Sequence, residues 1–291
     1  MRYLLAATMA SVLATGMLAQ ETTRQIVDAA FWGKRKPPTA AQPTPRPPAP
    51  PADYRPSTPT AAPPLTSLTR AVGLTVWRLR AVAESDRDVP RLLVPERPKA
   101  KPSPVVPERL GATDVANFGD RLRLGIEVSQ EGYLYVIDRE RYADGTLGEP
   151  FLLFPAADLR GGDNRVGPGQ LVDIPSQTDE IPALVLERSS PRHVGEELLV
   201  LVTLQPLPGI TAGPAPRPLA PALVAEWERQ WSNAASRLDL IAGRRQTWTS
   251  AEQLAGAGGR PLSQADPMPQ ALYYADLRND GLLVRIPLTV R

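Results

Sequence analysis

The sequence predicts a mainly β protein: an antiparallel β-sandwich with one C-terminal amphipathic helix and a C-terminal β-hairpin, preceded by a disordered Pro-rich linker. Two patterns support this fold class. Apolar and polar residues alternate through much of residues 70–208, as in strands that bury one face. Clusters of Gly, Pro, Asn and Asp separate these runs, as turns do. Of the 291 residues, 34 are Pro and 21 are Gly, so part of the chain is expected to be linker.

The N-terminus has the pattern of a secretory signal peptide, residues 1–19. Arg2 precedes an apolar stretch at residues 4–18, and the small residue Ala19 comes directly before Gln20. An N-terminal membrane anchor is the alternative, but the stretch is shorter than the roughly 20 apolar residues that span a bilayer. We therefore expect cleavage after Ala19, export to the periplasm or cell surface of a bacterium, and no transmembrane segment in the mature chain.

Residues 20–69 are predicted to be a disordered Pro-rich linker. Residues 37–64 contain 12 Pro with Ala, Thr and Ser between them, a composition that cannot bury enough apolar surface to offset the entropy of ordering. The preceding residues 20–36 are mixed, and a short helix at 26–31 is compatible with them. We interpret the Pro-rich run as a spacer, with docking of its PxxP-like spacings on a partner as the alternative.

Ordered structure is predicted to resume at residue 70. Apolar residues at every second position predict a strand at 71–83. Six Pro between residues 90 and 107 then predict an irregular stretch with a short extended piece at 92–94. Residues 70–107 are therefore expected to be a strand and an irregular segment that wraps the next domain.

Residues 108–208 are predicted to be the β-sandwich domain. In 120–128, apolar residues alternate with Arg121, Arg123 and Glu127, so those three side chains are expected on a face exposed to water. A turn leads to the return strand at 133–137, which completes a hairpin. The same pattern predicts four further strands, at 151–154, 170–174, 182–187 and 197–204.

The apolar period changes to three or four residues at 221–242, which predicts one amphipathic helix. Its apolar stripe consists of Leu223, Trp227, Trp231, Ala234, Leu238 and Ile241. The Trp pair is expected to dock on the β domain rather than to bind a ligand.

A hairpin is predicted at the C-terminus, with strands at 272–277 and 282–290 joined by a turn at 279–281. Pro287 favours an edge position in this ladder. Residues 209–291 would form only a marginal core alone, so we expect helix and hairpin to pack on the β domain.

Composition excludes several kinds of site. The chain has no Cys, which excludes disulfides, thiolate zinc sites and thiol nucleophiles. Its net charge is +2, and residues 108–208 carry 9 basic and 17 acidic side chains, so nucleic acid is not an expected partner. Tyr133 and Tyr135 lie on one side of their strand, and we assign them to the core rather than to a binding surface.

The single imidazole, His193, does not support catalysis in the sequence. It follows Ser189 and Ser190 in a Pro-containing turn between two predicted strands, too close in sequence to form a supported triad. We predict a solvated turn residue. Nucleophile-elbow, Walker and zinc-protease motifs are absent from the sequence, so a hydrolase is an alternative that no motif supports.

One acidic segment is a weak candidate for calcium. Asp138, Glu140 and Asp144 offer carboxylate oxygens, the ligands that Ca²⁺ prefers. Their spacing departs from the twelve-residue calcium loop, Arg139 and Arg141 lie among them, and Asp144 begins an ordinary turn dipeptide. We therefore predict no metal, no cofactor and no catalytic residue.

Residues 110–208 resemble the bacterial domain-of-unknown-function family 4384. The resemblance rests on motifs in order: the Gly-Asp-Arg opening at 119–121, Gly-Tyr-Leu-Tyr at 132–135, Leu-Phe-Pro at 153–155, Pro-Gly at 168–169 and Ile-Pro at 174–175. It implies an exported or envelope-associated β domain, sometimes joined to peptidase domains, and assigns no catalytic residue.

These observations together predict an exported, non-catalytic envelope protein that acts as a protein-interaction or structural module. Its expected partner is an envelope protein or a cell-surface component. The alternative is an accessory or regulatory partner of an envelope peptidase or other hydrolase, which the resemblance implies.

Overall fold

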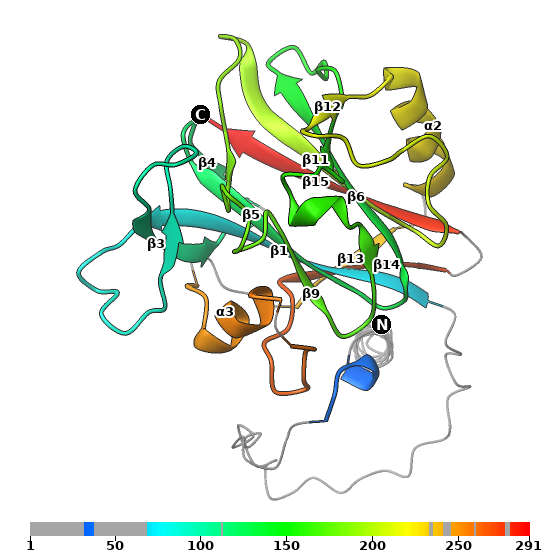
Figure 1. Ribbon diagram of the computed structural model, residues 1–291. Coiled ribbons are helices and arrows are strands. Elements are labelled where there is room, and N and C mark those ends of the chain that lie inside the picture. The colour runs from blue at the N-terminus through cyan, green and yellow to red at the C-terminus, as the bar shows by residue number, and fades with distance from the viewer. Residues whose placement is uncertain are drawn as a thin grey trace, which may run out of the picture.

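The computed structural model is mainly β, which confirms the predicted fold class, and its strands form two sheets (Figure 1). The predicted signal peptide, 1–19, and most of the predicted linker, 20–69, lie outside the described residues. The structure describes residues 32–37, 69–111, 113–232, 235–240, 246–258, 260–276 and 280–291.

The first sheet is built around β1 (Thr69–Ala81), the strand predicted at 71–83. One edge of β1 pairs antiparallel with β5 (Arg121–Val128), and the other pairs with β14 (Ala271–Asp276) and then β3 (Ser103–Arg109). The remaining strands of this sheet are β2 (Leu92–Val94), β9 (Leu171–Ile174), β10 (Leu184–Val185) and β13 (Ser236–Asp239).

β3 corrects the prediction of an irregular stretch. The Pro residues of 90–107 predict irregular backbone, yet Pro107 lies opposite Leu79 of β1 and Pro104 opposite Leu93 of β2. The carbonyl of Pro107 accepts a hydrogen bond from the backbone of Trp248 at 3.0 Å. Proline lacks only the amide donor, so a strand with few ladder bonds at those positions accommodates it.

The second sheet contains the strand that was predicted to form a hairpin with residues 120–128, and the last strand of the chain. That hairpin prediction is wrong: β5 pairs with β1, β9 and β10 in the first sheet, so the chain crosses to the second sheet at the turn after β5. β6 (Gly132–Tyr142) pairs with β11 (His193–Thr203), and β11 pairs in turn with β15 (Gly281–Val290), all antiparallel. The shorter strands of this sheet are β4 (Val115–Ala116), β7 (Phe151–Phe154), β8 (Arg165–Val166) and β12 (Arg217–Pro218).

The main core lies between the two sheets. Alternate residues of β1 and β5 face alternate residues of β6, β11 and β15, as in a sandwich. Val72, Ile126, Val136, Val200 and Leu282 are each 0% exposed in this cluster. Burial of these alternating side chains is the main apolar contribution to stability, at roughly 25 cal/mol per Å².

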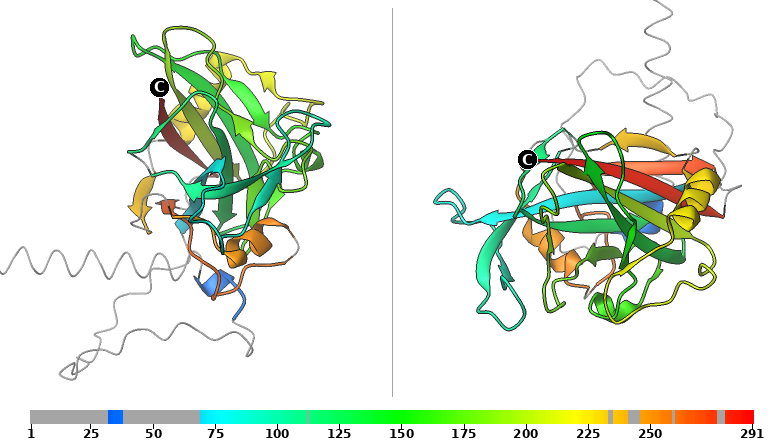
Figure 2. Two further views of the ribbon diagram at one scale, coloured as in Figure 1. Left: turned by 90° about the vertical axis from the view of Figure 1, so that its left-hand side faces the viewer. Right: turned by 90° about the horizontal axis from the view of Figure 1, so that it is seen from above.

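The helix α2 (Pro221–Trp231) covers the outer face of the second sheet (Figures 1 and 2). Val224, Trp227 and Trp231 are buried in a second apolar cluster with residues of β6, β11 and β15. The expected docking of the Trp pair is therefore confirmed. No helix in the described residues has the length and apolarity that a membrane span requires.

The predicted helix at 221–242 was too long. α2 ends at Trp231, and residues 236–239 form β13, which pairs with β14 at the edge of the first sheet. Leu238 therefore belongs to a strand, and Leu223 is 36% exposed, with Val224 buried in its place. Ala234 and Ile241 lie outside the described residues. A free strand edge supplied the competing backbone partners that helical periodicity does not reveal.

The predicted C-terminal hairpin is also corrected. Both of its strands exist, but β14 pairs with β1 and β13, whereas β15 pairs with β11 and β4. The chain therefore crosses from one sheet to the other at this turn. Pairing with longer strands on either sheet satisfies more backbone groups than a two-stranded ladder would.

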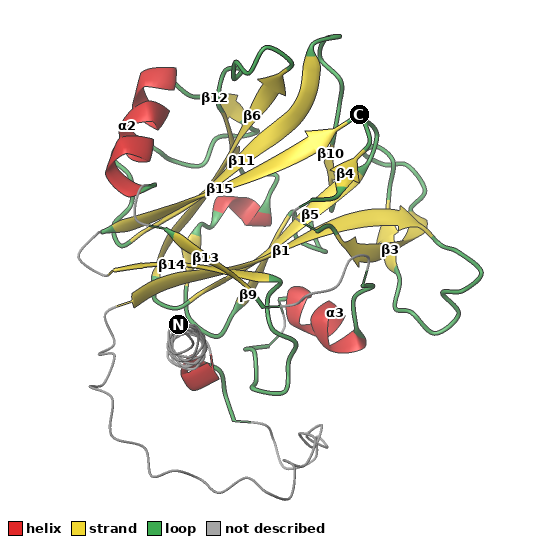
Figure 3. Cartoon of the chain, turned by 180° about the vertical axis from the view of Figure 1, so that it is seen from behind, coloured by secondary structure: helices red, strands yellow, loops and turns green. Residues whose placement is uncertain are grey.

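The outer face of the first sheet is covered rather than exposed to water. The helix α3 (Ser250–Gly256), which was not predicted, lies over this face together with residues 260–270 (Figure 3). Arg123 is 1% exposed and Glu127 is 2% exposed, which corrects the prediction that they are solvated. The strand pattern alone does not show that a segment more than 120 residues later covers its polar face.

Candidate functional site

The predicted carboxylates are not brought together as a calcium site. Asp138 and Glu140 lie on β6, but Asp144 lies in the following turn, where it accepts hydrogen bonds from Thr146 and pairs with Arg192 at 3.0 Å. Within the part of the chain that the structure describes, no group of three His, Asp or Glu side chains is arranged to hold a metal ion. The calcium candidate Asp138, Glu140 and Asp144 therefore gains no support.

Two of these carboxylates instead join a buried cluster that the sequence did not reveal. Glu140 of β6 lies directly opposite Glu196 of β11, and Asp138 is on the same face of β6. Burial, and then the neighbouring carboxylates Asp138 and Glu140, raise the pKa of Glu196 to about 9. Burial also raises the pKa of Asp138 to about 7. One oxygen of Asp138 and one of Glu196 have no hydrogen-bond partner among the described residues.

His193 adjoins this cluster, and its position corrects the prediction of a solvated turn residue. It is the first residue of β11 and only 1% exposed. Its Nδ1 accepts a hydrogen bond from the backbone of Ser189 at 3.4 Å, and its Nε2 lies 3.0 Å from the carbonyl oxygen of Gly195. Since a carbonyl only accepts, Nε2 carries the proton in this arrangement. Glu196 lies 3.1 Å from the same nitrogen.

Three buried Arg–carboxylate pairs hold the outer layer of the first sheet. Arg109 of β3 binds Glu252 of α3, with 2.5 Å between Nη2 and Oε1. Arg123 of β5 faces Asp173 of β9 at 3.5 Å, and its Nη2 donates to the carbonyl of Pro182. In the third pair, Arg35 binds Glu127 of β5. Buried pairs of this kind fix which segments meet, because removing one partner leaves an uncompensated charge.

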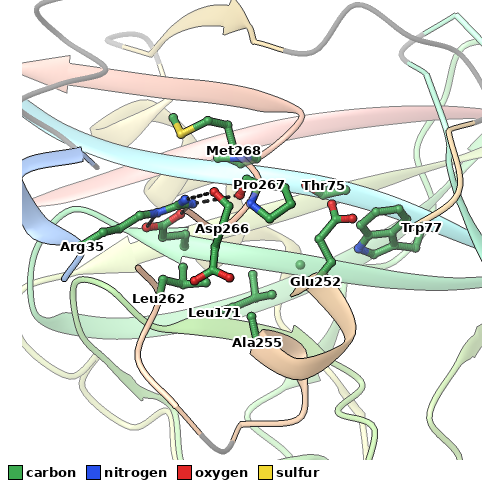
Figure 4. A pocket seen from close by; sticks show the side chains of 13 residues that line it. Arg35, Thr75, Trp77, Leu171, Glu252, Ala255, Leu262, Asp266, Pro267 and Met268 are labelled. Atoms are coloured by element: carbon green, nitrogen blue, oxygen red, sulfur yellow. Dashed lines mark hydrogen bonds and ion pairs between the residues drawn. The ribbon is translucent and has the colours of Figure 1, made fainter. Parts of the chain in front are cut away.

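A small cavity lies among these pairs, between β1, β5, α3 and residues 262–269 (Figure 4). Trp77, Leu171 and Met268 form much of its apolar wall, and Glu252 and Arg35 reach it from two sides. Its volume of about 30 Å³ has room for one water molecule, not for an organic ligand. We therefore interpret it as a packing gap in the outer layer.

An open polar cleft lies beside the beginning of β6. Its volume is about 500 Å³, within the usual range of ligand sites. Three segments meet there: the start of β6 with its preceding turn, β8 and the residues after it, and the residues that follow β11. The cleft is lined by Glu131, Gly132, Tyr133, Arg165, Val166, Gly167, Gln170, Leu204 and Gln205.

The side chains of this polar cleft are largely uncommitted. Glu131, Arg165, Gln170 and Gln205 are all exposed, and no ion pair of Glu131 or Arg165 occurs among the described residues. Leu204 is 43% exposed, although large apolar side chains are usually covered. The cleft therefore offers both hydrogen-bond donors and acceptors around a small apolar surface.

Tyr133 and Tyr135 have different places, although the sequence put both in the core. Tyr135 is fully buried, and its hydroxyl accepts a hydrogen bond from the backbone of Leu207 at 2.8 Å. Tyr133 is half-buried and forms part of the wall of the polar cleft. Alternation predicts that both side chains point to the same side of β6. Tyr133 lies nearer the beginning of the strand, where the layer that covers this side of the sheet ends.

A second open depression adjoins the polar cleft. It has a volume of about 220 Å³, and Gln170 contributes to both. Arg160 and Arg260 line it, and Arg260 pairs with Asp266 at 2.5 Å. The two depressions together provide a longer polar surface than either alone, which suits an extended ligand.

The sequence pattern indicated no residue of the polar cleft as a binding residue, and it assigned Tyr133 to the core. Comparison with protein-family models, with curated proteins and with solved structures finds no match to this chain. The resemblance of residues 110–208 to family 4384 therefore stays an expectation. The site is described below from its own chemistry.

Proposed function

We propose that this protein is an exported, non-catalytic binding module that contacts an envelope protein or cell-surface component of a bacterium through the polar cleft. The observation that carries the proposal is the set of uncommitted side chains around Tyr133 in an open cleft of about 500 Å³. Exposed polar side chains without protein partners, beside the half-buried Tyr133, leave hydrogen-bonding groups free for another molecule.

The chemistry of the cleft favours an extended polypeptide segment as the occupant. Glu131 and Arg165 carry opposite charges, and Gln170 and Gln205 each provide a donor and an acceptor. A peptide backbone also presents donors and acceptors in alternation. Leu204 and Tyr133 supply apolar surface for a side chain of that segment, and the adjoining depression extends the surface beyond Gln170.

The non-catalytic part of the proposal rests on how His193 is used. Its two nitrogens face the backbone of Ser189 and Gly195, and its ring packs edge-on to Phe118 with 5.0 Å between centroids. A general base needs a lone pair that reaches substrate. The arrangement instead favours a structural role for this imidazole.

Export is supported by the N-terminal sequence pattern, and N-terminal sequencing of the protein recovered from bacterial envelopes tests it. The expected first residue is Gln20, because Ala19 is the small residue at the end of the apolar stretch. A mature pool that begins at Met1 would contradict export with cleavage. This experiment is independent of the binding proposal.

A second candidate is that the module serves an envelope peptidase or other hydrolase as an accessory or regulatory partner. The resemblance of residues 110–208 to a family found joined to peptidase domains favours this candidate. Both candidates use the same polar cleft. They differ in the identity of the molecule that occupies it.

Photocrosslinking tests both candidates. A photoreactive residue replaces Gln205 in the polar cleft, and a control protein carries it at Arg229, whose side chain is 70% exposed on α2. We expect a discrete crosslinked partner for the cleft position only, weakened by Arg165→Glu. A hydrolase as that partner supports the second candidate. Equal products from both positions, or no change with Arg165→Glu, would overturn the assignment of the cleft.

A further inference from the structure

Arg35 lies in a built binding site for a guanidinium group. The side chain is 1% exposed, and it comes from residues 32–37, which precede β1 by the whole Pro-rich run. Its Nε and Nη2 bind the two oxygens of Glu127 at 3.0 and 2.7 Å, the bidentate geometry that arginine prefers. Nη1 donates to the carbonyl of Asp266 at 2.7 Å and Nη2 to that of Pro267 at 3.2 Å (Figure 4).

We name this site the arginine socket: Glu127 with the carbonyls of Asp266 and Pro267. All three guanidinium nitrogens have a partner in it. Such complete matching is specific, because a lysine offers one compact ammonium and cannot reproduce the planar fork.

The backbone next to Arg35 is held by one isolated parallel β-bridge. Lys36 forms a parallel bridge with Ser263, and its amide donates to the carbonyl of Leu262 at 3.1 Å. Its own carbonyl accepts from Gln264 at 2.8 Å. The segment is therefore recognised as strand-added peptides are: main-chain bonds hold it, and one side chain enters a pocket.

The surroundings make an empty arginine socket unfavourable. Burial raises the pKa of Glu127, whereas the hydrogen bonds and charge of Arg35 lower it. Without a cation, this carboxyl stays buried and unpaired or takes up a proton. The site therefore requires an arginine, which distinguishes it from a surface to which the segment merely adheres.

We propose that the groove between β5 and residues 262–267 recognises an extended arginine-bearing segment, and that residues 32–37 occupy it as an intramolecular strap. This inference goes beyond the polar cleft and does not depend on it. Its consequence concerns the Pro-rich run, which leaves the folded domain at residue 37 and returns to it at residue 69. The residues that flank the run on both sides then belong to one folded unit, which differs from the sequence-based interpretation of the run as a spacer.

The covalent connection between the strap and the domain also determines how strongly a competing segment must bind. A strap joined by a chain of this length is present at an effective concentration on the order of 1 mM. A partner with an arginine-bearing segment displaces it only if its own concentration and affinity exceed that competition. The strap therefore acts as an internal competitor for the groove.

Cleavage of the Pro-rich run in the full-length chain tests the proposal. A protease site is introduced near residue 50, the chain is cut after folding, and retention of the N-terminal piece is measured by gel filtration and native mass spectrometry. We expect the piece to stay bound in the wild type and in the neighbouring control Lys34→Ala. Arg35→Ala is expected to weaken retention at least 10-fold, and Arg35→Lys several-fold.

Peptide binding provides a second readout on the uncut Arg35→Ala chain. A fluorescent peptide of residues 31–38 is expected to bind this chain more tightly than the wild type, whose own strap competes. The same peptide with Ala in place of Arg35 is expected not to bind. If Arg35→Ala folds only with the wild-type peptide, the recovery of folding supports the proposal. Loss of the piece from the cut wild type, or equal retention in Arg35→Ala, would overturn it.

Discussion

The indole of Trp231 joins the end of α2 to the beginning of β15. Its Nε1 donates a hydrogen bond to Oδ1 of Asp280 at 2.7 Å. The ring also lies against Gly281, where an added Cβ would come within 2.8 Å of ring atoms. Glycine at this position therefore allows the helix to approach the beginning of β15.

Substitution of Gly281 by Ala tests this approach. The added methyl group cannot fit without moving the Trp231 ring or the strand, and overpacking of this kind typically costs about 1–3 kcal/mol. We expect a lower denaturation midpoint with an unchanged slope in urea. Gly167→Ala is the control, because its Cβ would meet only Glu131 at 3.9 Å. Equal effects of the two variants would contradict the role of the contact.

The double variant Trp227→Ala, Trp231→Ala tests whether the C-terminal part unfolds with the sandwich. Each indole is 5% exposed in the cluster under α2, and β15 of that cluster pairs with β11. Each truncation is expected to cost about 3–5 kcal/mol.

The expected result for the double variant is a single transition at lower temperature, with coincident curves from circular dichroism and near-ultraviolet absorbance. Two separate transitions, with the second at the wild-type temperature, would show that residues 209–291 unfold independently. Leu254→Ala is a control, since this side chain on α3 is 60% exposed.

The buried carboxyls predict a stability that falls as pH rises. Burial raises the folded-state pKa of Asp138 from 3.8 to about 7 and that of Glu196 from 4.5 to about 9. The folded state therefore holds protons that the unfolded state has released above about pH 4. The free energy of unfolding then decreases as pH rises, up to about pH 7 through Asp138 and up to about pH 9 through Glu196, by at most about 1.4 kcal/mol per pH unit for each group.

Glu196→Gln removes the carboxyl whose pKa is raised by the larger amount. The variant is expected to lose less stability than the wild type between pH 5 and 9 and to be the more stable protein at pH 9. Urea denaturation across this range measures the slope, and Glu226→Gln, whose side chain is 66% exposed, should reproduce the wild-type slope. A wild type whose stability does not change from pH 5 to 9 is incompatible with the buried cluster.

We expect His193→Ala to lower the stability of the folded protein. The imidazole is 1% exposed, and its removal leaves the Gly195 carbonyl and Glu196 without their partner. Unsatisfied buried polar groups cost about 1–3 kcal/mol each. Thermal denaturation should show a clear decrease in melting temperature. An unchanged melting temperature would restore the solvated position that the sequence suggested.

Strands that bury one face against the core could be predicted from local pattern. Residues 120–128, 133–137, 151–154 and 197–204 correspond to β5, β6, β7 and β11, although β6 continues to Tyr142 and β11 already begins at His193. Alternation is a property of neighbouring side chains, and it survives any arrangement that provides an apolar surface on one side. The docking of Trp227 and Trp231 was predictable for the same reason.

Contacts between segments that are far apart in sequence could be identified only from the tertiary structure. The capping box of Thr249 and Glu252 was a local signal for α3 that was missed, but its role in covering β5 was not local. Arg123 and Glu127 look like a solvated face until residues from α3 and the strap lie over them. Likewise, the polar cleft exists because three separate segments end at one place.

Whether a feature of this protein could be predicted from the sequence depends on how far apart in sequence the residues that form it lie. Side-chain period, turn residues and the apolar N-terminal stretch act over fewer than about 20 residues, so they could be read along the chain. Sheet membership of β14 and β15, the early end of α2 and the burial of Arg35 depend on partners far away in sequence. Buried backbone groups and buried charges need hydrogen-bond or ion-pair partners, and these partners come together only when the sheets assemble.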